Sequence, residues 1–252
     1  MEKKLYILTG ASRGLGFSIA KQLLSESIAL ICISRSSNDE LAQAALDSNS
    51  VLEQWCCDLS ESESVCLKLS EWIGVNGEHS FQSATLINNA GMMPRIVPLS
   101  KAEHHDLTKA LRVSLEAPML LCAAFLCATE GWHKPRKILN VSSGLGHRAM
   151  ASQAGYCASK AGMDQFTRCL AIEESSKDNG ARVCSLSPGI IDTDMQVQLR
   201  SASHADFPDH GYFVDHQQKG SLVSAKETAQ NVLHFLLHRN FGDSPVADIR
   251  DV

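Results

Sequence analysis

The sequence has few of the features that mark membrane, secreted, metal-binding or nucleic-acid-binding proteins. No basic run accompanies its net charge of -5, so there is no electrostatic reason to expect nucleic acid. Its nine cysteines form no C-x-x-C pair or zinc-ligand spacing and are odd in number, so we expect reduced thiols and no metal site. No apolar run approaches ~18 residues, the length that a membrane-spanning helix needs. The first residues lead almost directly into a strand without a secretory signal, so we expect a cytoplasmic protein.

The chain has the composition and the alternation of segments expected of one α/β domain. Of its 252 residues 44% are hydrophobic, and α/β folds of this length commonly form a single domain. Short β-rich runs alternate with segments of helical period, without an internal repeat or a linker. Strands are predicted at residues 4–9, 29–33, 51–57, 84–88, 137–141, 182–186 and 245–249, and helices at 17–24, 61–72, 101–128 (kinked at Pro118), from 154 and at 225–237. This alternation predicts a doubly wound parallel β-sheet with helices on both faces, spanning residues 1–252.

A glycine-rich turn joins the first strand to the first helix. Gly10, Gly14 and Gly16 follow the strand in the pattern Gly-x-x-x-Gly-x-Gly. Small residues let the backbone approach a pyrophosphate, and the N-terminus of the next helix attracts its negative charge. The spacing differs from the general Gly-x-Gly-x-x-Gly fingerprint, so on its own the pattern also fits a tight strand-to-helix turn.

Two arginines stand where the adenosine half of a dinucleotide would bind. Arg35 follows the second strand, where an NAD site offers a carboxylate to the ribose, and Arg13 lies in the glycine-rich turn. Two guanidinium groups can hold a 2′-phosphate by charge-assisted, bidentate bonds. We therefore expect NADP(H) rather than NAD(H), with solvated loop arginines as the alternative. Asp58 ends the third strand and can accept a hydrogen bond from the adenine amino group, or it caps a turn.

Tyr156 and Lys160 form a candidate acid/base pair. They are four residues apart in a segment of helical period, so both side chains lie on one face of a helix. A fixed ammonium favours the phenolate and so lowers the pKa of a nearby phenol. Tyr156 is therefore a candidate general acid or base with Lys160 as its activator. The pair alone is also common by chance on amphipathic helices.

A long segment without helical or strand period occupies residues 190–221. It is polar and contains His204, His210 and His216. Long irregular segments after a strand end commonly form lids or binding loops, so we expect a substrate loop here. The histidines show no metal-ligand spacing and are expected to be exposed to solvent.

Taken together, the motifs resemble the short-chain dehydrogenase/reductase family in order and spacing. They are Thr9 to Gly16, Asn88-Asn89-Ala90-Gly91, Ser143, Tyr156-x-x-x-Lys160 and Pro188-Gly189, and they cover essentially the whole chain. Within the family the chain is most similar to the sepiapterin reductase and benzil reductase branch, through residues 8–17, 117–120 and 246–251. The resemblance implies a Rossmann-type fold, a nicotinamide cofactor and a homodimer or homotetramer.

The resemblance also implies NADPH-dependent reduction of a ketone or vicinal diketone. Tyr156 would donate a proton to the carbonyl oxygen, Ser143 would hydrogen-bond that oxygen, and Lys160 would hold the nicotinamide ribose and lower the Tyr156 pKa. Thr193 resembles the threonine that contacts the carboxamide, and Asp248 resembles a carboxylate that anchors the pterin in sepiapterin reductases. The expected cofactor contacts are Gly10, Ser12, Arg13, Gly14, Leu15, Gly16, Arg35, Ser36, Asp58, Leu59, Asn89, Ala90, Gly91, Tyr156, Lys160, Pro188, Gly189, Ile191 and Thr193.

Ser114 is the departure from the family pattern. The family carries there a catalytic asparagine, which shapes a helix bend and helps to hold a proton-relay water. A serine has one donor hydroxyl and less reach, so the relay is the part of the mechanism that this sequence leaves open. Two other functions also remain open: an NADP-dependent alcohol or steroid dehydrogenase, and an NADP(H)-binding regulator with little turnover.

Overall fold

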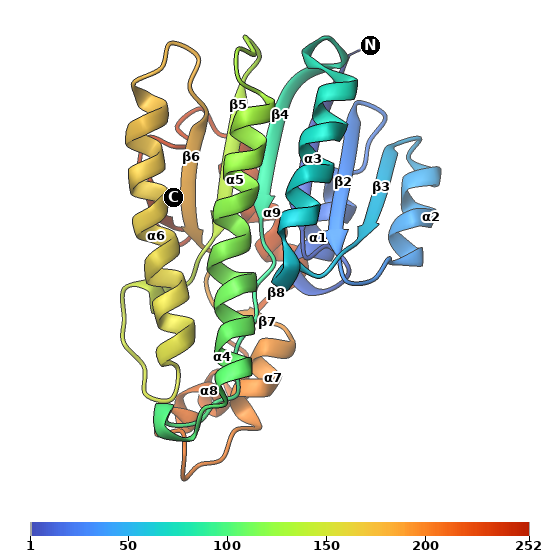
Figure 1. The fold of residues 1–252 in the computed structure, drawn as a ribbon. Helices are drawn as coiled ribbons and strands as arrows, with labels where there is room; N and C mark the ends of the chain where they lie inside the picture. Colours follow the sequence, from blue (N-terminus) through green and yellow to red (C-terminus); the bar gives the residue numbers. More distant parts are fainter. Residues whose placement is uncertain (1, 252) are drawn as a thin grey trace.

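Seven parallel strands form one sheet in the computed structural model, which describes residues 2–251 (Figure 1). The sheet order is β3-β2-β1-β4-β5-β6-β9. The strands are β1 (Lys3–Thr9), β2 (Ile28–Ser34), β3 (Val51–Cys56), β4 (Phe81–Asn88), β5 (Arg136–Val141), β6 (Arg182–Ser187) and β9 (Val246–Asp248). All seven residues of β2 are buried, because helices cover both faces of a parallel sheet. The predicted fold class is confirmed, and each predicted strand is present to within three residues at either end.

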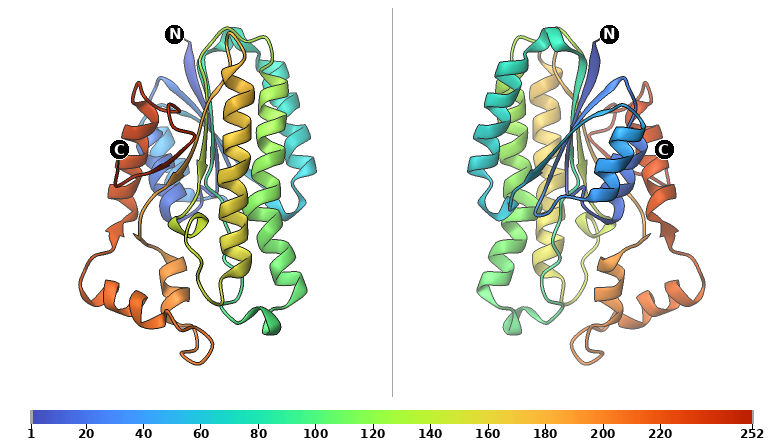
Figure 2. Two further views of the ribbon diagram at one scale, coloured as in Figure 1. Left: turned by 90° about the vertical axis from the view of Figure 1, so that its left-hand side faces the viewer. Right: turned by 90° about the vertical axis from the view of Figure 1, so that its right-hand side faces the viewer.

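Helices cover the two faces of the sheet (Figure 2). On one face lie α3 (Glu63–Asn76), α5 (Ala117–Ala128) and α6 (Ala154–Ser175), and on the other lie α1 (Gly14–Leu23) and α9 (Ala225–Leu237). Each layer has its own apolar core, one built around Leu69 and Phe125 and the other around Ile19 and Val232. A further helix, α2 (Asp39–Asp47), precedes edge strand β3 and has no counterpart in the sequence prediction.

The helix predicted at 101–128 begins at residue 104 and contains a π-helical turn. α4 (His104–Leu111) passes through a π segment, Arg112–Glu116, into α5. Pro118 has no N–H to donate one turn back, and just before it the Ala117 N–H bonds to the Arg112 carbonyl five residues earlier. The irregularity therefore precedes Pro118, in the turn that contains Ser114. The stretch His104–Ala128 is long and apolar enough to cross a membrane. Core helices also meet these criteria, and residues of α5 pack against the sheet here.

The segment predicted to be irregular, 190–221, is largely folded. It contains β7 (Ile191–Asp192), α7 (Asp194–Arg200) and α8 (His210–Gln218), and β7 pairs with β8 (Val223–Ser224). Both helices lie beyond the carboxyl ends of the main strands (Figure 1). The buried Phe213 of α8 stacks on the buried Phe207, which lies between α7 and α8, in a third apolar cluster. The prediction failed because this cluster, rather than a local period, holds the helices.

The histidines of this segment also differ in part from expectation. His204 is exposed as predicted, whereas His210 and His216 are half-buried. The His210 ring lies 2.8 Å from the Arg200 carbonyl, and the His216 ring lies 2.6 Å from the Ser221 hydroxyl. These histidines therefore help to fix α7 and α8.

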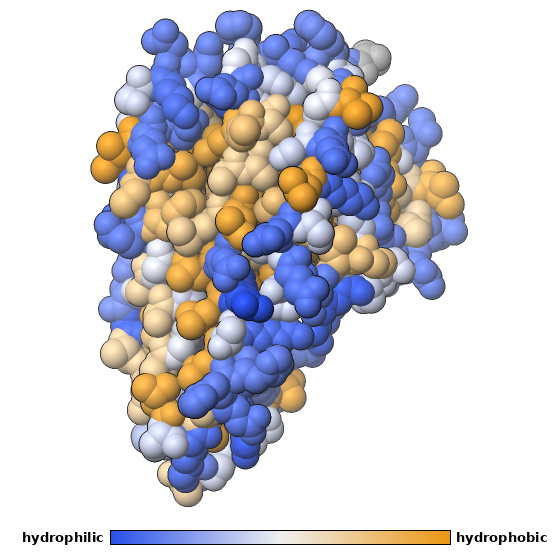
Figure 3. All heavy atoms as spheres, viewed as in Figure 1, coloured by the Kyte–Doolittle hydropathy of each residue, from blue (hydrophilic) through white to orange (hydrophobic). Residues whose placement is uncertain are grey.

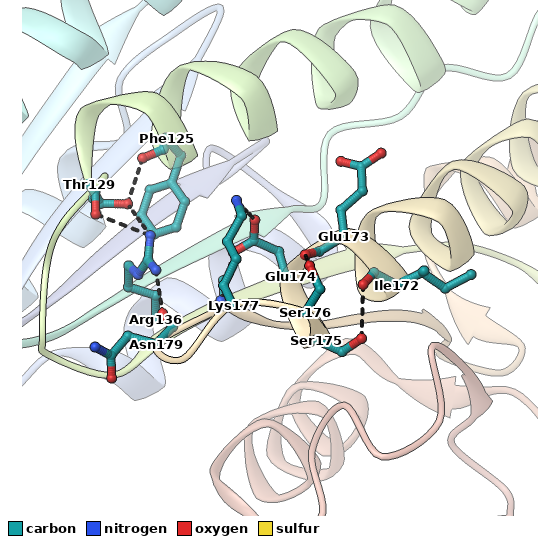
Figure 4. A network of polar contacts seen from close by, with 11 residues as sticks. Phe125, Thr129, Arg136, Ile172, Glu173, Glu174, Ser175, Ser176, Lys177 and Asn179 are labelled. Atoms are coloured by element: carbon teal, nitrogen blue, oxygen red, sulfur yellow. Dashed lines mark hydrogen bonds and ion pairs between the residues drawn. The ribbon is translucent and has the colours of Figure 1, made fainter.

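A buried arginine joins the far ends of α5 and α6 (Figure 4). Arg136 donates to the Thr129 carbonyl at 3.1 Å and to the Asn179 carbonyl in the turn that follows α6. Its positive charge lies at the C-terminus of α5, where the helix dipole favours a cation. These bonds fix the helices at the end of the sheet opposite the one that α7 and α8 cover.

Leu69 offers a test of how α3 packs against the sheet. Leu69→Ala should lower the free energy of unfolding by about 2–5 kcal/mol, because the Leu69 side chain is 0% exposed and its loss leaves a cavity. Leu67→Ala is the matched control on the same helix, where Leu67 is 67% exposed and should contribute less than about 0.5 kcal/mol. Urea denaturation measures both values. Equal losses would contradict the orientation of α3.

Candidate active site

A cleft of about 930 Å³ opens at the carboxyl ends of β1, β4, β5 and β6. Ligands of open α/β sheets bind at this edge, where loops from neighbouring strands meet. The cleft is lined by every site residue predicted from the sequence except Ser36, which is exposed beside it, and Ser114, which lies behind it. Residues from α7 and α8 form part of its wall, among them Leu199 and Phe213.

The glycine-rich turn is shaped for close approach of a phosphate chain. Gly10 adopts a φ of +71°, a conformation that glycine accepts readily. A Cβ atom on Gly16 would lie 2.1 Å from the Gly10 carbonyl oxygen, so only glycine fits there. The first turn of α1 carries no acidic side chain, and Arg13 at its N-cap makes no capping bond. The free N–H groups of this helix end fit a dinucleotide pyrophosphate.

Hydrogen bonds fix the loop after β4 against the glycine-rich turn. The Thr9 hydroxyl accepts from the Asn89 N–H at 3.0 Å and from the Ala90 N–H at 2.9 Å. The Asn89 amide donates in return to the Thr9 carbonyl at 3.0 Å. Both predicted cofactor segments therefore form one rigid wall of the cleft.

The residues predicted at the adenosine end have different partners. Arg13 pairs with Asp194 of α7 at 2.7 Å, whereas Arg35 is exposed and has no carboxylate partner among residues 2–251. The Asp58 carboxylate accepts from the Ser60 N–H at 2.9 Å and lies 3.3 Å from the Lys109 ammonium. The Ser60 hydrogen bond, with help from Lys109, lowers the pKa of Asp58. The sequence analysis did not identify Lys109 as a site residue. It lies on α4, which carries none of the motifs, and reaches the cleft from there.

Ser143, Tyr156 and Lys160 come together beside the end of β5. Ser143 follows the strand, and the other two lie one turn apart on α6. The Lys160 ammonium donates to the Val141 carbonyl at 2.8 Å and lies 5.7 Å from the centre of the Tyr156 ring. Tyr156 is 7% exposed and Lys160 is 4% exposed, so the acid and its predicted activator are shielded from water.

The pKa of Tyr156 differs from the sequence-based expectation. Burial raises the Tyr156 pKa, and a hydrogen bond with Ser143 offsets part of this rise. The net result is a raised pKa, whereas the sequence predicted a lowered one. Burial lowers the pKa of Lys160 itself to about 8, against the opposing effect of the Asp164 charge. The Lys160 ammonium donates its hydrogen bond to the Val141 carbonyl, and the burial of Tyr156 decides the direction in which the Tyr156 pKa changes.

Ser114 holds a backbone segment rather than facing the cleft. It is 0% exposed within the π-helical turn. Its hydroxyl accepts from the Met92 N–H at 2.9 Å and donates to the Met92 carbonyl at 3.2 Å. Both hydrogen-bonding functions of the serine are therefore used to fix the segment after Gly91, which lines the cleft.

The outer part of the cleft is apolar and could not be identified from the sequence. Its wall comes from four separate segments, so no single motif marks it. The apolar side chains are Met93, Leu145, Met150, Met195, Leu199 and Phe213. His147, Arg148 and Arg250 add polar groups.

Asp248 lies in this outer part with an internal partner. Its two oxygens accept from the Arg250 guanidinium at 2.7 Å and 2.6 Å. These hydrogen bonds lower the pKa of Asp248. The carboxylate predicted to anchor a substrate is thus already paired.

No trio of His, Cys, Asp or Glu side chains between residues 2 and 251 is arranged to hold a metal ion.

Comparison with known proteins gives a specific result: a family model described as short chain dehydrogenase matches residues 4–204. The chain belongs to the short-chain dehydrogenase family. Members use NAD(H) or NADP(H), which fits the glycine-rich turn and the long cleft described above.

The short-chain dehydrogenase relatives include carbonyl reductases. The chain is 35% identical over 243 residues to a benzil reductase ((S)-benzoin forming) of Bacillus cereus, covering 96% of this chain and 98% of the relative. It is 31% identical to sepiapterin reductase of Xenopus tropicalis, covering 92% and 90% of the two chains. A short-chain dehydrogenase/reductase structure from Saccharomyces cerevisiae superposes with a TM-score of 0.82 at 22% identity, covering 99% of this chain and 96% of that one, and this likeness concerns the fold alone.

Gly16→Ala tests the glycine-rich turn. The added Cβ would collide with the Gly10 carbonyl and displace the end of α1, so nicotinamide cofactor affinity should fall at least about tenfold. Gly74→Ala on α3 is the matched control, because nothing lies within 4 Å of its added Cβ. Fluorescence titration with NADPH and NADH measures both affinities. Unchanged binding by a folded Gly16→Ala protein would contradict this role of the turn.

Ser114→Asn tests the departure from the family pattern. An asparagine can also bond the Met92 backbone and restores the family side chain, so kcat should rise or change little while cofactor affinity stays constant. The larger side chain enters a fully buried site, so the melting temperature should be measured beside kcat. A stable variant with kcat reduced more than about tenfold would show that the proton path is built around serine.

Proposed function

We propose that this protein is an NADPH-dependent reductase of ketones or vicinal diketones. Its main support is the Ser143, Tyr156 and Lys160 set at the base of a cleft, in a chain similar to benzil reductase over almost its whole length. The apolar outer wall favours a substrate with aromatic groups, since methionine and phenylalanine side chains pack well against rings. Sepiapterin-like substrates are the second class within the proposal, because sepiapterin reductase is also among the relatives.

The reaction assigns one task to each polar side chain. A nicotinamide cofactor, when bound, would supply the hydride that reduces the carbonyl carbon. Tyr156 donates its phenolic proton to the carbonyl oxygen, and its raised pKa keeps that proton in place at neutral pH. Ser143 hydrogen-bonds the same oxygen while negative charge develops there. Lys160 holds the ribose side of the site and places positive charge near the developing anion.

Arg35 supports the choice of NADPH. Its guanidinium is exposed at the adenosine end of the cleft and is not engaged by a carboxylate in the described part of the chain. Arg13 lines the same end, where a 2′-phosphate would compete with Asp194 for it. Two cations beside one ribose position favour a phosphorylated ribose.

Association into a homodimer or homotetramer is a further part of the proposal. Apolar side chains gather on the outer side of α5 and α6 (Figure 3). Met119 is 40% exposed and Ile172 is 71% exposed on these helices. An apolar surface that no other element of the described chain covers favours contact with a second copy. Light scattering measures the mass in solution, and a monomer at working concentrations would exclude this assembly.

A cytoplasmic location, where the nine cysteines stay reduced, is also proposed.

Tyr156→Phe tests the proposed reaction. It removes the donated proton and keeps the ring, so kcat should fall about 10²–10⁴-fold while NADPH affinity stays within about threefold. Tyr6→Phe is the matched control, because Tyr6 is a buried phenol on β1 in the core under α1 and α9 and does not line the cleft. Benzil, sepiapterin, alcohols and steroids are assayed with each protein through nicotinamide absorbance. A Tyr156→Phe protein with nearly parental activity would exclude Tyr156 as the acid, and a parent without turnover on any substrate would overturn the reductase assignment.

Arg35→Asp tests the cofactor. Replacing a cation by an anion beside the 2′-phosphate should weaken NADPH at least about tenfold and leave NADH within about threefold. Arg95→Asp, on an exposed arginine that does not line the cleft, controls for the change in net charge. Isothermal titration of both cofactors gives the affinities. Equal affinity of the parent for NADPH and NADH would refute the preference.

A further inference from the structure

A buried carboxylate lies directly behind the active-site lysine. Asp164 follows Lys160 by one turn on the same face of α6, and it is 1% exposed. Carboxylates are rarely buried without a positively charged partner, because losing water costs the charged form several kcal/mol. Asp164 does not line the cleft, so it does not contact the substrate.

Strand β6 and the loop that follows Ser143 enclose the Asp164 carboxylate. The Ser185 hydroxyl on β6 donates to one oxygen at 2.6 Å. The second oxygen accepts no hydrogen bond from residues 2–251 and lies 3.3 Å from the His147 ring, which borders the cleft. A Cβ atom on Gly146 would lie 2.4 Å from this second oxygen, so the loop that follows Ser143 needs glycine to pass over the carboxylate.

Among the titratable groups near Asp164, Lys160 is the buried cation that its negative charge can stabilise. The His147 side chain is 52% exposed, whereas Lys160 is 4% exposed. Cys184 on β6 also faces Asp164, but burial raises its pKa to about 12, so it stays neutral. Asp248, on β9, is also near His147 and is paired with Arg250. Lys160 makes a hydrogen bond to a neutral carbonyl only, and the charge of Asp164 opposes the fall in its pKa.

We propose that Asp164 is a positioning residue, whose buried carboxylate favours the charged form of Lys160 beside Tyr156. The Ser185 hydroxyl bonds to one oxygen of this carboxylate, and Gly146 leaves room for the other. A merely structural link between α6 and β6 would need a hydrogen-bond acceptor for Ser185, which asparagine also provides. The negative charge itself distinguishes the two roles.

Asp164→Asn is the test, because it keeps the shape and the acceptor for Ser185 and removes the charge. Lysine labelled with ¹³C at Cε reports the titration of Lys160 by NMR, with Lys160→Arg used to assign the signal. The Lys160 midpoint should lie near pH 8 in the parent and should fall by about one unit or more in Asp164→Asn. Ser185→Ala is the matched control. It removes the hydrogen bond and keeps the charge, so it should lower the melting temperature and leave the midpoint in place.

A second test, the pH dependence of kcat/KM of Asp164→Asn, rests on the proposed function. If reduction needs charged Lys160, a one-unit shift should lower kcat/KM of Asp164→Asn about tenfold at pH 9 and less than twofold at pH 6. The NMR titration needs no substrate, so a parent that reduces no carbonyl would end the proposed function while the midpoints still decide the role of Asp164.

Each outcome decides the proposal. A Lys160 midpoint that is unchanged in folded Asp164→Asn would overturn it, as would an equal shift in Ser185→Ala. If Asp164→Asn does not fold, Gly146→Ala carries the test, because its Cβ displaces the carboxylate without removing it. That variant should shift the midpoint in the same direction by a smaller amount, and no shift would refute the role.

Discussion

The parallel pairing of the central strands is the constraint on which the rest of the structure depends. β1 pairs with β4, β4 with β5 and β5 with β6, all in the same direction, so four strands deliver their last residues to one edge. At that edge Thr9 can reach Asn89, and the Val141 carbonyl can hold Lys160. The cofactor turn follows β1, whereas the acid and its neighbouring ammonium lie more than 140 residues later in the sequence, on α6. Their arrangement is rigid because it is made of backbone ends and short hydrogen bonds rather than of flexible loops.

The parts that the sequence predicted correctly are those with a local physical signature. Strands buried on both faces need continuous apolar runs, and β2, Ile28–Ser34, shows such a run clearly. Gly16 sits where an added Cβ would collide with Gly10, so a glycine in this turn is informative without any tertiary context. Tyr156 and Lys160 share a helix face by spacing alone. The order of these features along the chain was enough to place nearly every predicted site residue around one cleft.

The parts that could not be predicted depend on partners distant in sequence. Helix α2 buries only Leu41 and Ala45, too few for a strong period, and α8 is held largely by the contact of Phe213 with Phe207. The bonds of Ser114 to the Met92 backbone exist because a π turn directs its hydroxyl there. The expectation for Tyr156 failed for a similar reason, since the spacing gave its neighbour but not the burial that raises its pKa. Asp164 belongs to no sequence motif, and its contacts with Ser185 and His147 are visible only in the structure.

The two borders of the sheet have a consequence for how copies of this protein can meet. A long, bare edge strand invites another chain to add a strand, which is a common route to aggregation. Here β9, Val246–Asp248, is only three residues long, and Asp248 and Arg250 place charges beside it. At the other border, Glu53 on β3 accepts hydrogen bonds from the indoles of Trp55 and Trp72. Short length on one side and a fixed charge on the other discourage continuation of the sheet from molecule to molecule. The self-association proposed above would thereby be directed to helix surfaces, where it can close into a finite assembly rather than grow into fibres.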